Sequence, residues 1–149
     1  MLARFLIVSA LVACAGCGGD STTPSEPPAN VAGTWTGQLG TSASGTALRL
    51  TWTATQSGST ASGPASLAKP SVGTEIPGTL SATINGTRAG LSFSAPPGSV
   101  PTLPACTASG TGSGTVGGNS ILGTFSLTAT ACDSIGVENA TSGALLMTR

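Results

Sequence analysis

The chain has 149 residues, with five Lys and Arg, five Asp and Glu, and neither His nor Tyr. A balanced charge with a single Lys excludes a basic surface for nucleic acid, and the absence of His removes the commonest general base and metal ligand. Gly, Ser, Thr and Ala together make up more than half of the chain, whose length suits one domain.

The first 16 residues have the organisation of an export signal. Arg4 precedes an apolar run from Phe5 to Ala13, and small residues then lead to Cys17. This run is too short to cross a bilayer as a helix, which takes about 20 residues. We therefore expect residues 1–16 to be a signal peptide that is removed on export.

Two cysteines in this segment end runs that resemble the lipobox of bacterial lipoproteins, in which a Cys is lipidated and becomes the new N-terminus. A Leu-Val-Ala-Cys run ends at Cys14 and has the closer sequence, whereas a Cys-Ala-Gly-Cys run ends at Cys17 and gives the more usual signal length. Lipidation of Cys17 leaves Cys106 and Cys132 as one pair in an oxidising compartment, and lipidation of Cys14 leaves an odd cysteine. We expect the anchor at Cys17, with Cys14 as the alternative.

The lipobox resemblance also implies a location. It places the protein in the bacterial cell envelope, where two or more acyl chains on the cysteine give stable attachment to a membrane. The residue after the lipidated Cys is Gly18 or Ala15, not Asp, which in lipoproteins implies transport to the outer membrane. Residues 17–30 are rich in Pro and Ser, so we expect the lipidated Cys to be followed by a disordered tether.

Residues 31–149 alternate apolar and polar side chains with a period of two, which predicts a single all-β domain. Their connections are short. This pattern favours an antiparallel up-and-down meander of about eight strands closed into a barrel, with a β-sandwich as the alternative. The predicted strands are 33–39, 48–56, 59–67, 78–84, 87–95, two strands within 105–132, and 143–148.

Turn residues predict the register of the first two hairpins. The loops are expected at Ser57-Gly58 and at Asn85-Gly86, the second of which is the strongest short signal for a hairpin. The expected partners across these loops are Trp52 with Gly63 and Leu80 with Leu91.

The third hairpin carries the two remaining cysteines, Cys106 and Cys132, whose midpoint lies at the turn. A disulfide between them would stabilise the fold by about 3 to 4 kcal/mol in the loop-entropy model. A two-residue Gly118-Asn119 loop sets Phe125 opposite Gly112 but offsets the cysteines by one residue, whereas a three-residue loop aligns the cysteines. A β-bulge among the glycines would reconcile both, and the alternatives stay open.

The ends of the domain carry a second resemblance. Gly33-Thr34-Trp35 begins the first predicted strand, and Arg149 follows the last. This arrangement resembles the calycin barrels (lipocalins, fatty-acid-binding proteins and avidins), in which a Gly-x-Trp packs against a late Arg or Lys. The resemblance implies that Gly33, Trp35 and Arg149 close the barrel. Gly37 stands where avidins place a biotin-binding Asn, so no biotin site is implied.

Catalytic patterns are weak. Ser66-Leu67-Ala68-Lys69 has the Ser-x-x-Lys spacing of penicillin-recognising enzymes, but that motif needs a helix and here lies between Pro64 and Pro70. We expect no enzyme, no metal site and no cofactor.

The interior of the predicted barrel suggests a function. Ala and Gly occupy many inward positions, so the sheet either packs closely or leaves room for one small ligand. An apolar guest would suit such a cavity, whose candidate lining residues are Leu48, Leu50, Trp52, Leu80, Leu91, Phe93, Phe125 and Leu127.

We therefore expect a lipid-anchored binding module for a small apolar ligand. The alternative is a structural or interaction lipoprotein with a filled core. The expected partners are the membrane, through the anchor, and the small ligand, with no nucleic acid; the sequence leaves any protein partner open.

Overall fold

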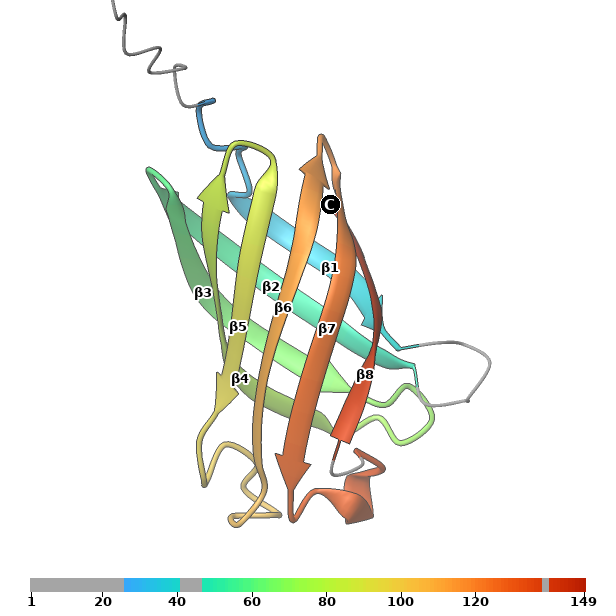
Figure 1. Ribbon diagram of the computed structural model, residues 1–149. Helices are drawn as coiled ribbons and strands as arrows, with labels where there is room; N and C mark the ends of the chain where they lie inside the picture. Colours follow the sequence, from blue (N-terminus) through green and yellow to red (C-terminus); the bar gives the residue numbers. More distant parts are fainter. Residues whose placement is uncertain (1–25, 41–46, 138–139) are drawn as a thin grey trace, which may run out of the picture.

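A computed structural model describes residues 26–40, 47–137 and 140–149, so the expected signal peptide, Cys14, Cys17 and most of the expected tether lie outside the described residues. Eight strands follow one another along the chain (Figure 1). They are β1 (Gly33–Leu39), β2 (Leu48–Ser57), β3 (Thr60–Ala68), β4 (Glu75–Asn85), β5 (Arg88–Ala95), β6 (Thr107–Gly117), β7 (Ser120–Thr130) and β8 (Ala140–Thr148).

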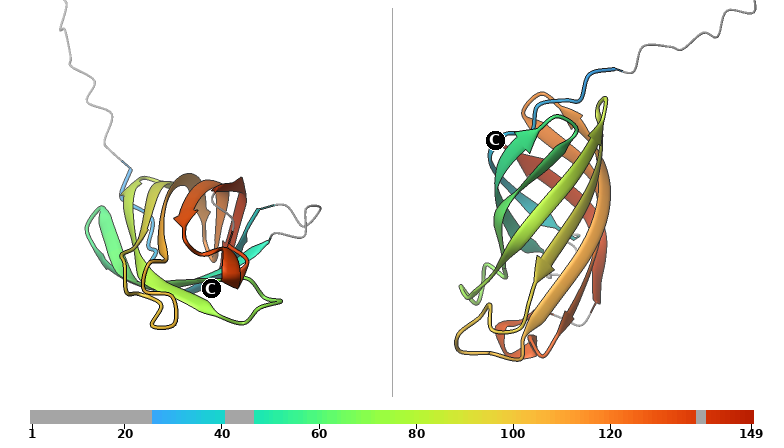
Figure 2. Two further views of the ribbon diagram at one scale, coloured as in Figure 1. Left: turned by 90° about the horizontal axis from the view of Figure 1, so that it is seen from below. Right: turned by 90° about the vertical axis from the view of Figure 1, so that its left-hand side faces the viewer.

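Every strand pairs antiparallel with the next, and β1 also pairs with β8, so the sheet closes into a barrel. The predicted all-β meander of about eight strands is confirmed. The β-sandwich alternative is wrong, because a sandwich would leave β1 and β8 as unpaired edges, whereas here they complete the cylinder seen in Figure 2.

The two ends of the barrel differ (Figure 1). The upper end carries three tight hairpins, the described N-terminal segment 26–32 and the C-terminus. The lower end carries the longer connections, and the one between β7 and β8 contains a single 3-10 turn, η2 (Asp133–Ile135). Among the described residues, the upper end is therefore formed by short loops, segment 26–32 and the C-terminus, and the lower end by the longer connections.

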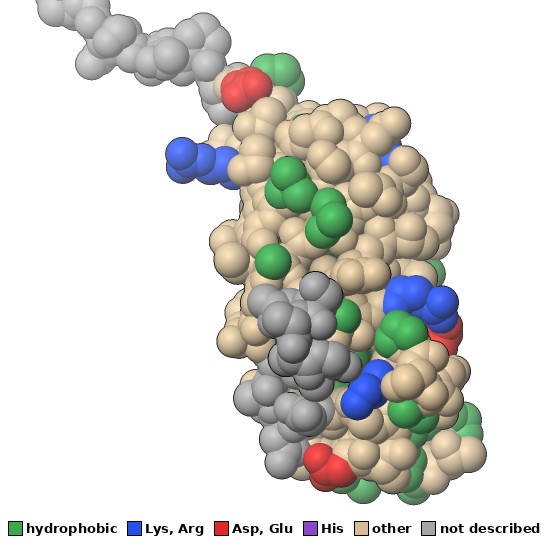
Figure 3. All heavy atoms as spheres, turned by 90° about the vertical axis from the view of Figure 1, so that its right-hand side faces the viewer, with side chains coloured by type: hydrophobic (Ala, Val, Ile, Leu, Met, Phe, Trp, Pro, Cys, Tyr) green, Lys and Arg blue, Asp and Glu red, His purple; other side chains and the backbone are tan. Residues whose placement is uncertain are grey.

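Alternating side chains separate the interior from the outer wall. Strand β5 shows the pattern over its whole length, because every second residue is buried and the others are exposed. The buried side chains of all eight strands form one hydrophobic core, and the described residues bury no charged or polar side chain besides the two indoles. The wall consists mostly of Ser and Thr, with few charged side chains on the face in Figure 3.

The three hairpins share one turn geometry. Their two-residue loops are Gly58-Ser59, Gly86-Thr87 and Gly118-Asn119, and the glycine has φ of 58°, 56° and 61°. Glycine at the first central position with positive φ is the pattern of type II′ turns, whose twist suits a hairpin.

The predicted registers of the first two hairpins are wrong by two residues. Trp52 pairs with Ala65, and Leu80 pairs with Phe93. The predictions placed each glycine second in its two-residue loop. In the structure the glycine is first in the loop and is the loop residue with positive φ, as a type II′ turn requires. Because the error is an even number of residues, the apolar side chains remain on the predicted face.

The third hairpin adopts the two-residue Gly118-Asn119 loop. Val116 pairs with Ile121 and Gly112 pairs with Phe125, so large side chains of β7 lie opposite small residues of β6. The Phe125 ring occupies the space that a side chain at Gly112 would need, since a Cβ there would come 2.5 Å from the ring.

Candidate functional site

The upper end of the barrel is closed around Trp35 and Arg149. The guanidinium carbon of Arg149 lies 5.0 Å from the centroid of the Trp35 ring. Its Nη1 donates to the Ala32 carbonyl at 2.8 Å, and its Nε donates to Asn119 Oδ1 at 3.2 Å. Arg149 thus joins β1, the β6–β7 turn and the segment that precedes β1, and the structure brings together the residues of the calycin resemblance.

The segment before β1 covers the same end. Val31 is fully buried, and its carbonyl accepts a hydrogen bond from the Trp35 indole nitrogen at 2.8 Å. Gln56, near the end of β2, also holds the segment, because its Oε1 accepts from the Val31 N–H at 2.6 Å and its Nε2 donates to the Ala29 carbonyl at 3.0 Å. Gly33, with φ of 123°, allows the chain to turn from this segment into β1.

Sequence reasoning missed Gln56, although a signal was present. In β2 the residues two apart from Leu48 onward all face the interior, and Gln56 continues this series as its only polar member. A polar residue at the end of an apolar face indicates a partner at the barrel mouth, which here is the backbone of the N-terminal segment.

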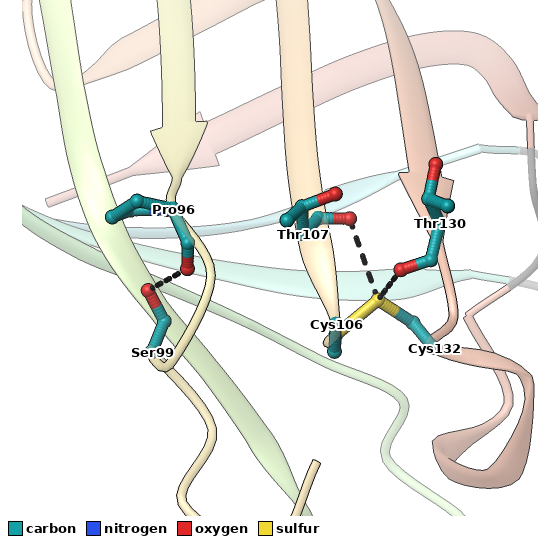
Figure 4. The surroundings of a disulfide bond; sticks show 6 residues. All are labelled: Pro96, Ser99, Cys106, Thr107, Thr130 and Cys132. Carbon is teal, nitrogen blue, oxygen red and sulfur yellow. Dashed lines mark hydrogen bonds between the residues drawn. A yellow bond between two sulfur atoms is a disulfide. The ribbon is translucent and has the colours of Figure 1, made fainter. Parts of the chain in front are cut away.

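The predicted disulfide between Cys106 and Cys132 is confirmed (Figure 4). The cysteines lie just beyond the last register pair of the hairpin, Thr107 with Thr130, and their Cα atoms are 4.9 Å apart. Ala131 has φ of 57° and is the single non-glycine residue with positive φ in the described part of the chain. This left-handed residue turns Cys132 toward Cys106, so the one-residue offset needs no bulge among the glycines.

Apolar residues from the long connections cover the lower end. Val100 and Val137 are buried, as is Ile135 of η2. The disulfide ties the roots of the two connections that carry these residues, because Cys106 ends one and Cys132 begins the other. Side chains of the loops therefore close this end, and the disulfide, a covalent staple, joins the two loops that carry them.

The eight residues proposed to line a cavity all face the interior, on β2, β4, β5 and β7. None has more than 4 % of its surface exposed, and the highest value belongs to Phe125. The Phe93 ring likewise lies against the wall at Gly78, where a Cβ would come 2.7 Å from its Cζ. Side chains therefore fill the space between these residues in this state of the protein.

The two tryptophans are neighbours in one row across the sheet. Trp35 on β1 pairs with Trp52 on β2, and the row continues through Ala65 to Gly78. Both indoles are buried, with 0 % and 1 % exposure. The Trp35 N–H has its partner at Val31, whereas the Trp52 N–H has no hydrogen-bond partner.

The Ser-x-x-Lys residues are not brought together. The Ser66 hydroxyl, on the outer wall of β3, lies 2.7 Å from the Thr51 hydroxyl. Lys69 follows the strand, and its side chain lies over Gly136 beyond η2, where a Cβ would come 2.7 Å from the lysine Cδ. The separation arises because Ser66 lies within an extended strand and Lys69 beyond its end, whereas the motif needs a helix to bring the two side chains together.

The outer wall carries open grooves. One of about 570 Å³ crosses β3, β4 and β5 and is lined mainly by Ser and Thr. Another, of about 480 Å³, lies beside Leu146 on β8. Leu146 pairs with Leu122 on β7, and these two side chains are 49 % and 55 % exposed, so they form a small apolar patch.

Comparison of the chain with protein families, characterised proteins and solved structures gives no match. Within residues 26–40, 47–137 and 140–149, no helix has the length and apolar character needed to cross a membrane. The same residues contain no group of three or more Cys, Asp or Glu side chains placed to hold a metal ion.

Proposed function

We propose that this protein is a lipid-anchored, calycin-like barrel of the bacterial cell envelope that binds a small apolar molecule in its interior. The observation that carries the proposal is the packing of Arg149 on Trp35 at the closed end of an eight-stranded meander, with the guanidinium carbon 5.0 Å from the ring centroid. That pairing is the feature on which the calycin resemblance rests. Barrels of eight strands have room for side chains or for one small ligand.

The asymmetry of the two ends supports a route of entry. Hydrogen bonds from Gln56 and Arg149 fasten the upper end, whereas the side chains of Val100, Ile135 and Val137 cover the lower end. Long connections move more readily than strand ends, and the Cys106–Cys132 disulfide restrains only the roots of these two connections, so we propose that the guest enters through the lower end. Inside, it takes the place of side chains that now fill the barrel.

A filled barrel that works through its outer wall is the second candidate. The observation in its favour is that the eight proposed lining residues are at most 4 % exposed. In that case the hydroxyl-lined grooves and the Leu122–Leu146 patch would contact a protein or polymer of the envelope.

Native mass spectrometry of the full-length protein, purified from the envelope in detergent without reductant, separates the two candidates. Extra non-covalent mass that disappears on extraction with organic solvent supports the binding module. A bare mass both before and after extraction, together with no uptake of added apolar compounds, contradicts it and favours the filled barrel.

The anchor is tested on the same preparation. We propose Cys17 as the lipidated residue, with Cys14 as the alternative. The Cys17→Ala variant should lose the acyl mass and leave the membrane fraction, whereas Cys14→Ala should keep both. The opposite result would assign the anchor to Cys14. Absence of acyl mass from the wild-type protein as well as from both variants would exclude a lipoprotein.

A further inference from the structure

The Trp52 indole nitrogen is the one buried polar side-chain atom among the described residues that has no hydrogen-bond partner. Leaving a buried donor unpaired is unfavourable, because the group has given up its hydrogen bond to water and gained none in return. Native proteins pair nearly all such groups, so each exception needs an explanation. The neighbouring Trp35 is equally buried and does have a partner, the carbonyl of Val31.

A buried water molecule would not suit this position. A water molecule inside a protein typically makes two to four hydrogen bonds. The side chains buried with Trp52 are apolar. Trp52 itself pairs with Trp35 on one side and Ala65 on the other, and the β2–β3 register is interrupted only at the next two residues of β2. Water there would have the indole as its only side-chain partner.

A guest molecule with its own apolar body does suit the position. Ala65 and Gly78 follow Trp52 in its row and have little or no side chain. The Phe93 ring now occupies the space beside Gly78, so the guest would take the place of that ring next to the indole. One hydrogen-bond acceptor on the guest would satisfy the indole N–H, and the rest of the guest would contact only hydrocarbon.

Charge narrows the class further. No Lys, Arg, Asp or Glu side chain is buried among the described residues. A charged group in such an interior would remain uncompensated, which costs far more than burying a neutral polar group. The acceptor is therefore a neutral oxygen, not a carboxylate.

We propose that Trp52 is the polar contact of the binding site and that the ligand is a neutral apolar molecule with a carbonyl or similar oxygen, bound through the indole N–H. This inference rests on the proposed binding function and specifies its substrate class. It also makes Trp52 the residue that distinguishes a ketone or ester from a hydrocarbon of equal length, whereas a fatty-acid carboxylate is disfavoured by the lack of a buried cation among the described residues.

Three probes of one chain length test the inference: decane, 2-decanone and decanoate. They are titrated into the full-length protein in detergent, with empty micelles as the reference. We expect 2-decanone to bind about tenfold more tightly than decane, the gain of one well-formed hydrogen bond to a donor that is otherwise unpaired. Decanoate should bind more weakly than 2-decanone.

NMR spectroscopy gives a direct readout, because the chain has two tryptophans and therefore two indole N–H signals. The variants Trp35→Phe and Trp52→Phe assign them. On addition of 2-decanone the Trp52 proton should move downfield, and decane should leave it nearly in place. Trp52→Phe should bind the ketone and the alkane equally, whereas Trp35→Phe should retain the preference for the ketone.

The possible failures are distinguishable. If the wild-type protein binds decane and 2-decanone equally, the inference is overturned but the binding function stands. The same conclusion follows if decanoate binds most tightly of the three. If none of the probes binds, the proposed function itself fails. If Trp52→Phe does not fold, the affinities of the wild-type protein and the shift of its Trp52 signal still decide the question.

Discussion

Single glycines decide how the core of this barrel packs. Gly112 faces the interior beside Phe125, and Gly90 lies on the outer wall with open space around it. Both occur within strands and neither has positive φ, so their conformations suit any residue. The difference between them is only what a side chain would meet.

Gly112→Ala and Gly90→Ala should therefore have opposite effects. At Gly112 the new methyl group would lie 2.5 Å from the Phe125 ring and 2.6 Å from the Thr124 carbonyl oxygen, and overpacking of this kind costs about 1 to 3 kcal/mol. At Gly90 alanine should stabilise the strand by about 0.5 kcal/mol or more, through the entropy of the unfolded chain. Urea unfolding measures both, and equal effects would contradict the packing described.

Arg149 supports the closed end through several weak contacts. Arg149→Ala should lower the free energy of unfolding by about 1 kcal/mol, the size expected for an exposed cation–π contact together with solvent-exposed hydrogen bonds from the guanidinium. Arg88→Ala is the matched control on the outer wall and should change stability by less than about 0.5 kcal/mol. Urea unfolding with Trp fluorescence reports both, since Trp35 lies under Arg149. Equal stability of the two variants would remove the proposed role of Arg149 in closure.

Individual residues were predictable where their chemistry is local. Leu80 and Leu91 were expected to face inward from the alternation of their strands, and both are buried. Trp35 and Arg149 were singled out only by the resemblance to calycin barrels, and the structure brings them together. That Trp52 was inward-facing followed from the alternation of its strand. Its unpaired N–H did not follow from the sequence, because it depends on which groups of other strands surround the indole.

At the scale of elements, the β6–β7 hairpin is the longest in the sheet and is stapled at its open end. Its register extends from Gly117 with Ser120 to Thr107 with Thr130, and the disulfide follows directly. Both sulfur-bearing residues are fully buried. The disulfide therefore holds together two strands and the roots of the β5–β6 and β7–β8 connections.

Removal of this staple should be costly. The double variant Cys106→Ala and Cys132→Ala should lower the free energy of unfolding by about 3 kcal/mol, because the unfolded chain regains the freedom of a 26-residue span. Denaturant titration without reductant makes the measurement. The wild-type protein should keep its disulfide in mild reductant until it unfolds, since both cysteines are inaccessible. An unchanged midpoint in the variant would show that the staple does not constrain the unfolded chain.

The hairpins show what local sequence can predict. Turn residues and alternation correctly predicted that the strands pair and which side chains face inward. They did not predict the register of two hairpins, because a shift of two residues keeps every side chain on its face. The position of a glycine with positive φ within the loop decided the register instead.

At the scale of the whole molecule, the barrel has one seam between the first and last strands. β1 and β8 share four register pairs, from Thr36 with Thr148 to Leu39 with Leu145, whereas β6 and β7 share eleven. The seam joins strands that are distant along the chain, and it is the shortest ladder of the barrel.

Hydrogen exchange should reveal this inequality. Amides of the β1–β8 ladder should exchange by local opening well before those of the β6–β7 ladder, which should exchange only on global unfolding. NMR-detected exchange in the native state makes the comparison. Equal protection of the two ladders would mean that the barrel opens as one unit.

The sequence by itself determined the period-two alternation, the number of strands, the faces they bury and the identity of the disulfide pair. These follow from local chemistry, since side-chain alternation and turn residues act within a few positions of the chain. Only the tertiary structure decided the closure of β1 on β8, the fit of Phe125 over Gly112 and the unpaired state of the Trp52 N–H. Each depends on groups that meet across the barrel, where the relative shift of the strands, and not their order, sets which side chains come together.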